Sequence, residues 1–215
     1  MARALAARLG VPYIDTGAMY RAVGLAARAA GMSLPLEDPN AVVDLAEKGR
    51  IGLEATPGGL RTSWNGRDVT EAIRAPEISI YASAVSAIPG VRKRLVAEQQ
   101  RLGRERGGVL EGRDIGTRVF PETPHKFFLT ASADVRAQRR ARELGERGTP
   151  RPYGEVLEDM GRRDHDDSTR ADSPLTLDGG YTVIDSTEKD ASQVVSEIEA
   201  LVRQGGKLTG ATPAT

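Results

Sequence analysis

The chain has 215 residues, a length that fits one domain with a substantial core. Its 30 Lys and Arg residues balance 30 Asp and Glu residues, so no overall charge draws it to nucleic acid or to an acidic membrane. It has no Cys, which excludes disulfides and thiolate metal sites and suits a reducing cytoplasm, and no apolar run is long enough to span a bilayer.

The N-terminal part predicts a helix, a strand and a second helix in succession. Residues 2–9 are strong helix formers, and Gly10 stands where a C-terminal cap belongs. Residues 11–15 are typical of a short buried strand. Thr16-Gly17-Ala18 then opens a helix that carries Met19 and further apolar residues toward a core. This order is the α/β pattern.

The middle of the chain predicts an insert of a different kind. A helical stretch over 40–48 is followed by short runs with β character, at 51–54, 60–64 and 68–69. The breaks at Pro57-Gly58-Gly59 and Asn65-Gly66 are typical of tight turns, so we expect a small antiparallel meander here.

The remaining elements continue the α/β alternation. We expect helices over 77–87 and 91–104, then three more short buried strands, at 108–111, 127–129 and 182–184. Between the last two strands lies a long, strongly charged helical region, 133–170, broken by Gly145, Gly148, Pro150 and Pro152. A final helix is expected over 191–204, and the Gly-, Thr- and Ala-rich tail 205–215 is expected to be disordered.

Two motifs follow predicted strands and carry charge. The segment Asp15-Thr16-Gly17-Ala18-Met19-Tyr20-Arg21 opens a helix, where backbone donors and Arg21 can meet an anion. The segment Glu111-Gly112-Arg113-Asp114-Ile115-Gly116-Thr117 lies just past a strand end, where open α/β sheets bind ligands. Gly112 and Gly116 are expected to let the backbone approach that ligand. A solvated Arg21 and an ordinary loop ion pair remain the alternatives.

A third motif closes the charged region at Arg162-Arg163-Asp164-His165-Asp166-Asp167-Ser168-Thr169-Arg170. Arg163, Asp167 and Arg170 are four and three residues apart and can share one helical face, as they also would on a solvated surface helix. Only one His is nearby and the spacing matches no zinc motif, so we expect no metal site.

Taken together, these motifs resemble the bacterial cytidylate kinase family in the same order, with Glu71-Ala72-Ile73-Arg74 and with Ser83 followed by Val91-Arg92 between them. The resemblance runs from Ala2 to about Gln204. It implies an α/β fold of the P-loop nucleoside monophosphate kinase type, with a parallel sheet flanked by helices. The implied domain is 1–204, divided into a core (1–32, 105–135, 171–204), a nucleoside monophosphate-binding insert (about 33–104) and a lid (about 136–170).

The resemblance also implies roles for particular residues. Ser83, Arg92 and Asp114 would read cytosine, Arg163 and Asp167 would hold the ribose, and Thr16 would join the substrate site. Arg21, Arg113 and Arg170 would bind the phosphate of CMP, since guanidinium pairs bidentately with a dianion. Arg113, Arg163 and Arg170 are the implied catalytic residues, and the lid residues Arg139, Arg140 and Arg142 would close over the ATP phosphates.

The implied reaction is the transfer of the ATP γ-phosphoryl group to CMP or dCMP, with Mg²⁺ as the metal, in a monomer that engages neither nucleic acid nor membrane. The sequence departs from the family in one respect, because it holds no G-x-x-x-x-G-K-[ST] phosphate loop. Residues 1–10 resemble the helix that follows this loop. We therefore expect that the chain starts after the first strand and the loop, and that the polypeptide as given has little turnover.

Two alternatives stay open. Beside the kinase, the chain can be a catalytically inactive CMP-binding remnant or an interaction domain whose arginines bind acidic partners. The interaction domain predicts no discrimination between CMP and AMP, whereas the base-reading set Ser83, Arg92 and Asp114 predicts a clear preference for CMP.

Overall fold

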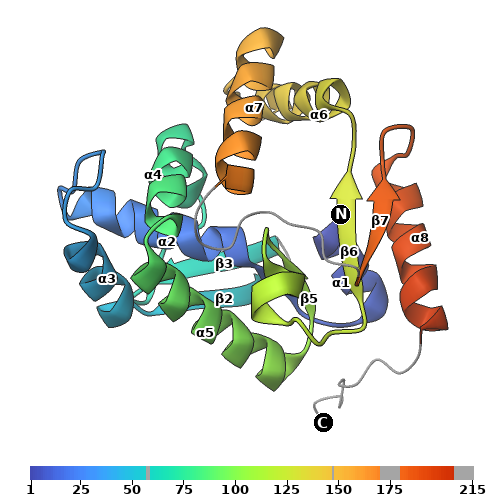
Figure 1. Cartoon of the computed structure of the whole chain (residues 1–215), viewed down its shortest axis with the longest axis horizontal. Helices are drawn as coiled ribbons and strands as arrows, with labels where there is room; N and C mark the ends of the chain where they lie inside the picture. The colour runs from blue at the N-terminus through green and yellow to red at the C-terminus, as the bar shows by residue number, and fades with distance from the viewer. Residues whose placement is uncertain (57–58, 147, 170–179, 206–215) are drawn as a thin grey trace.

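The computed structural model describes residues 1–56, 59–146, 148–169 and 180–205. Helices surround two pairs of parallel strands and one small antiparallel sheet (Figure 1). The α/β class expected from the sequence is confirmed. The predicted disordered tail falls almost wholly in residues 206–215, which lie outside the described residues.

The first three elements follow the predicted order. Helix α1 (Ala2–Leu9) ends at Gly10, whose φ of 67° is the left-handed conformation that favours glycine in a helix cap. Strand β1 (Tyr13–Asp15) leads directly into α2 (Thr16–Ala29). The Asp15 side chain caps α2 by accepting a hydrogen bond from the Ala18 backbone N–H at 2.9 Å.

The parallel strands form two separate pairs, each flanked by helices. Strand β1 pairs with β5 (Val109–Glu111), and β6 (Lys126–Thr130) pairs with β7 (Tyr181–Asp185). Among the described residues no ladder joins β5 to β6. The second pair packs with α1 and α8 (Ala191–Gln204) through a core that includes Leu5, Ile184 and Val195.

The insert is the predicted meander. Helix α3 (Pro39–Lys48) precedes β2 (Ile51–Thr56), β3 (Gly59–Trp64) and β4 (Arg67–Asp68), which pair antiparallel in chain order. Asn65 and Gly66 have φ values of 50° and 81°, as the tight turn between β3 and β4 requires. The prediction from Asn65-Gly66 is therefore confirmed.

The main hydrophobic core lies between the insert and the first strand pair. A short 3₁₀ turn, η1 (Ala72–Arg74), leads into α4 (Pro76–Ser86), and α5 (Pro89–Arg106) follows. Helices α2 and α5 bury Met19, Val23, Val91 and Leu95, each at most 1% exposed. This packing fixes α2 against α5, and both helices carry predicted site residues.

The charged region forms a helical hairpin. Helices α6 (Ala133–Glu146) and α7 (Tyr153–Thr169) stand at the top of Figure 1, away from the main core. They share a small core of their own, made of Ala137, Leu144 and Val156. Within the described part of the chain, no helix has the length and apolar character needed to cross a membrane.

Candidate functional site

The site is built on the carboxyl ends of β1 and β5, which lie side by side in register from Tyr13 opposite Val109 to Asp15 opposite Glu111. Thr16, the first residue of α2, is 3% exposed and donates a hydrogen bond from its hydroxyl to the Glu111 carbonyl at 2.7 Å. The Tyr13 hydroxyl donates to the Glu111 carboxylate at 2.9 Å. The start of α2 and the segment after β5 are therefore tied together, where a parallel sheet binds ligands.

Burial raises the pKa of the Tyr13 hydroxyl far above its ordinary value, and the negative charges of Asp15 and Glu111 add to the effect. Above pH ~10 an unfolded tyrosine ionises, whereas folded Tyr13 keeps its proton. Folding therefore loses stability as the pH rises above ~10. Urea unfolding between pH 8 and 11 should show a shallower alkaline loss for Tyr13→Phe than for the wild type, and parallel losses would contradict this assignment.

Arg21 lies one helical turn into α2 and folds back toward the start of the helix. Its Nη2 donates to the Asp15 carboxylate at 3.2 Å, and its guanidinium nitrogens come within 3.6 Å of the space that a Cβ on Gly17 would fill. The Arg21 Nε is buried and has no hydrogen-bond partner among the described residues. A cation with an unused donor thus stands beside a helix N-terminus, an arrangement that favours an anion.

The centre of the site is a buried ion pair between α5 and the segment after β5. Arg92 Nη1 donates to the Asp114 carboxylate at 2.7 Å, and the two side chains are only 4% and 5% exposed. Arg92 also donates to the Tyr20 hydroxyl at 3.4 Å, while its Nε has no hydrogen-bond partner in the described part of the chain. A buried charge pair with a spare donor is costly to maintain, which is typical of a site built to receive a polar ligand.

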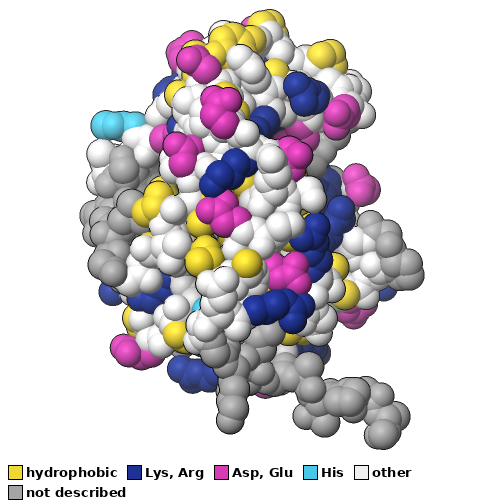
Figure 2. All heavy atoms as spheres, turned by 90° about the vertical axis from the view of Figure 1, so that its right-hand side faces the viewer, with side chains coloured by type: hydrophobic (Ala, Val, Ile, Leu, Met, Phe, Trp, Pro, Cys, Tyr) yellow, Lys and Arg dark blue, Asp and Glu magenta, His cyan; other side chains and the backbone are white. Residues whose placement is uncertain are grey.

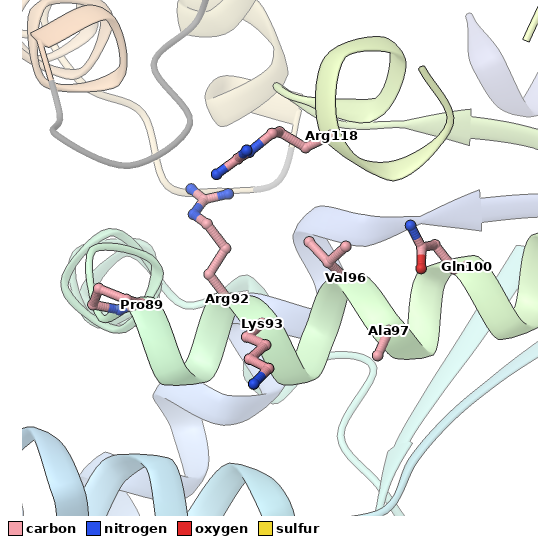
Figure 3. Close-up of a pocket in the computed structure, with 7 residues that line it drawn as sticks. All are labelled: Pro89, Arg92, Lys93, Val96, Ala97, Gln100 and Arg118. Carbon is pink, nitrogen blue, oxygen red and sulfur yellow. The ribbon is translucent and has the colours of Figure 1, made fainter. Parts of the chain in front are cut away.

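A π-helical turn, η2 (Ile115–Val119), follows Asp114 and was expected only as loop. The Asp114 carbonyl accepts from the Arg118 and Val119 backbone N–H groups at 2.8 and 3.3 Å, and this turn aims Arg118 back toward α5. Figure 3 shows the Arg118 guanidinium pointing at that of Arg92 across a cavity of about 370 Å³. Pro89, Lys93, Val96, Ala97 and Gln100 complete the lining of this cavity.

The two glycines of the second motif approach protein side chains rather than open space. A Cβ on Gly112 would lie 2.5 Å from the Thr16 hydroxyl oxygen, and one on Gly116 would lie 2.6 Å from the Tyr181 hydroxyl oxygen. The Gly116 N–H donates to that hydroxyl at 3.1 Å. A side chain at either position would therefore collide with its neighbours, so the close packing of this segment requires glycine at both.

The structure brings some predicted residues together directly. Arg92 contacts Asp114, and Arg113 immediately precedes Asp114 on the exposed side of the same segment. Ser83 lies exposed in the last turn of α4, and its carbonyl accepts from the Ser86 hydroxyl at 2.8 Å. Tyr20 and Arg118 also border Arg92. Tyr20 lies within the first motif and Arg118 directly follows the second, and neither carries a further sequence signal.

The structure describes the side chains of only some of the predicted lid residues. Arg163 and Asp167 lie in α7, but their side chains are outside the described part of the structure, as is Arg170 altogether. Arg139 donates to the Ser186 hydroxyl and to the Ser186 and Lys189 carbonyls, at 3.1, 2.7 and 2.9 Å. Arg140 pairs with Glu143 at 2.7 Å.

Figure 2 looks onto the side of the molecule that carries α8. Basic and acidic side chains are interspersed there, with apolar side chains scattered between them. Ion pairs join Arg8 and Arg203 to Glu199, and Lys189 to Glu197. The described residues of α8 and its surroundings thus pair basic with acidic side chains on this face.

Comparisons with known proteins point to one family. A family model described as cytidylate kinase matches residues 1–204. The cytidylate kinase of Caldanaerobacter subterraneus subsp. tengcongensis is 44% identical over 207 residues, which cover 96% of this chain and 90% of the relative. That of Shouchella clausii is 42% identical, covering 95% and 90%. That of Solibacter usitatus is 44% identical, covering 94% and 86%.

Proposed function

Because the chain belongs to the cytidylate kinase family, we propose that it provides the fold for transfer of the ATP γ-phosphoryl group to CMP or dCMP, giving CDP or dCDP. The observation that carries the choice of acceptor is the buried contact between Arg92 and Asp114. Phosphoryl transfer needs little covalent chemistry from the protein and depends on positioning and charge neutralisation. The residues of the site are therefore given the roles of binding and orienting the two nucleotides.

The base is read by the buried pair together with Ser83. Asp114 presents carboxylate oxygens, which accept a hydrogen bond from the exocyclic amine of cytosine, and Arg92 presents donors for the carbonyl edge. Adenine offers no carbonyl to Arg92, and uracil offers no amine to Asp114. A preference for cytosine follows from this donor and acceptor pattern.

The phosphate of CMP is held by arginines that meet at the start of α2 and after β5. Arg21 has an unused buried Nε beside the helix N-terminus, and Arg113 lies on the neighbouring segment. Arg170 is assigned here on the family pattern alone. The dianion would draw Arg21 away from Asp15, because a phosphate is the stronger partner for a guanidinium fork.

The ribose and the donor nucleotide are assigned to the lid. Arg163 and Asp167 would hold the ribose hydroxyls, and Arg139 and Arg140 would reach the ATP phosphates. Arg139 is tied to two backbone carbonyls and Arg140 to a carboxylate in the described state. Engaging ATP therefore requires these arginines to exchange partners as α6 and α7 close, which would also exclude water from the transfer.

Mg²⁺ is the metal that this family reaction implies. The described residues contain no group of three or more His, Cys, Asp or Glu side chains that could hold a metal ion. In kinases Mg²⁺ is coordinated largely by phosphate oxygens and water. We assign the ion to the nucleotide phosphates and give no residue of this chain the role of ligand. The protein is proposed to act as a monomer in the cytoplasm on small nucleotides.

The proposal is tested by calorimetric titration with CMP, UMP and AMP, since binding of the acceptor does not depend on the phosphate loop for ATP. The wild-type chain should bind CMP roughly 5- to 150-fold more tightly than AMP, the range that one good hydrogen-bonding pair to a base provides. Asp114→Asn should remove most of this preference. The matched control is Asp68→Asn, which changes an exposed carboxylate paired with Arg61 in the insert and should leave the preference intact.

Equal affinities for CMP and AMP in the wild-type chain would reject the proposed acceptor and favour the interaction domain. Tight and selective CMP binding without phosphoryl transfer would identify a CMP-binding protein that lacks the kinase activity. A coupled assay with ATP and CMP separates this outcome from the full reaction.

A further inference from the structure

Tyr20 lies against the guanidinium of Arg92. The Arg92 Cζ stands 5.6 Å from the centre of the Tyr20 ring, and Nη1 is 3.4 Å from the tyrosine hydroxyl. Tyr20 is partly buried and packs on the main core through α2, whereas Arg92 comes from α5. The aromatic face therefore joins two helices at the point where one of them presents its buried cation.

Arg92 needs such support for three reasons. Its long side chain loses considerable rotamer freedom when fixed, and Asp114 holds only Nη1, from one side. Within residues 1–56, 59–146, 148–169 and 180–205, its Nε has no hydrogen-bond partner that would fix the plane of the guanidinium. Arg118 points at it from across the cavity, and two like charges repel. The ring of Tyr20 supplies a flat surface on which a guanidinium stacks favourably.

We propose that Tyr20 is a positioning residue that sets the plane of the Arg92 guanidinium, so that its remaining donors meet the carbonyl edge of the pyrimidine. The inference rests on the proposed function, because it concerns how the base is read. It assigns Tyr20 no contact with the phosphate and none with the ribose. The effect of changing Tyr20 should therefore depend on whether the ligand has a base.

The test compares CMP with ribose 5-phosphate, which keeps the sugar and the phosphate but has no base. Tyr20→Leu removes the aromatic face, and Tyr20→Phe keeps the face and removes only the hydroxyl. Tyr81→Leu is the matched control, since Tyr81 packs on the same core from α4 and donates to the Met32 carbonyl at 2.8 Å. Among the described residues, no arginine stacks on its ring. Affinities are measured by calorimetry on the full chain.

Tyr20→Leu should weaken CMP binding by roughly 5- to 30-fold, the range for a desolvated cation–π contact, and leave ribose 5-phosphate unchanged. Tyr20→Phe should lower the affinity for CMP by about threefold or less, because the hydrogen bond from Arg92 to the tyrosine hydroxyl is long. Tyr81→Leu should leave the ratio of the two affinities unchanged. In a chain that already carries Arg92→Met and Asp114→Leu, Tyr20→Leu should have no further effect on CMP.

Three results would overturn the positioning role. The first is an unchanged CMP affinity in Tyr20→Leu. The second is an equal loss of affinity for CMP and for ribose 5-phosphate, and the third is a full loss of CMP affinity on Tyr20→Leu in the chain that already lacks Arg92 and Asp114. A wild-type chain with no preference for CMP over AMP would instead overturn the proposed function, so the two failures are distinguishable.

Discussion

Replacing Asp114 with alanine will lower the free energy of unfolding by about 3–5 kcal/mol and abolish selective binding of CMP. The reason is the burial of its partner, since the Arg92 side chain is 4% exposed and would keep its charge without a counterion. Urea denaturation gives the stability, and titration with CMP and AMP gives the selectivity. A loss below about 1 kcal/mol, the value typical of exposed pairs, would contradict the burial of this contact.

The paired variant Arg92→Met with Asp114→Leu separates folding from recognition. Apolar replacements of both partners fill similar space and leave no buried charge, so this variant should recover most of the stability that Asp114→Ala loses. It should not recover the preference for CMP, because neither the acceptor nor the donors for the base remain. If the variant kept the preference for CMP, Arg92 and Asp114 would not be the residues that recognise the base.

Replacing Ile78 with alanine will cost about 2–5 kcal/mol of stability, the usual range for deleting a buried branched side chain. Ile78 is 0% exposed in α4, the helix that carries Ser83. The same helix provides a matched control in Ile80, which is 58% exposed. Ile80→Ala should stay within about 0.5 kcal/mol of the wild type, since a surface change leaves no cavity.

Both isoleucine variants are measured by urea denaturation under the same conditions. The difference between them isolates burial, because the residue type, the helix and the substitution are the same. Equal effects at the two positions would contradict the packing of α4 on the main core.

Local rules predicted the elements of this fold well. The dipeptide Asn65-Gly66 predicted the turn between the second and third strands of the meander, because few other dipeptides adopt two positive φ values in succession. Gly10 marked the end of α1, and the breaks after Gly145 separated α6 from α7. In each case the signal lies within a few residues of the feature that it specifies.

The arrangement of the strands was not predictable in the same way. Four short strands predicted parallel sheet flanked by helices, and the structure shows which strand pairs with which, in two separate parallel pairs among the described residues. Strand pairing depends on contacts between distant segments, and each strand here has at most five residues, too few to encode its neighbour. The π-helical turn after Asp114 is another tertiary feature, since it depends on how the segment packs against Thr16 and Tyr181.

The candidate site was predictable as a set of charges but not as a geometry. The motifs named Arg92 and Asp114, yet only the structure shows that they form a buried contact. The structure adds that Gly112 and Gly116 pack closely against Thr16 and Tyr181, which the sequence did not indicate. Tyr20 was not predicted as a site residue, although it lies beside Arg21 in the first motif. No sequence pattern shows which side chain stacks on an aromatic ring.

A structure of the chain with CMP bound tests the central claim most directly. We expect the cytosine ring to lie within about 3.5 Å of both the Asp114 carboxylate and the Arg92 guanidinium, and the phosphate to lie beside Arg21 at the start of α2. A nucleotide seated elsewhere, with its base in contact with neither Asp114 nor Arg92, would contradict it.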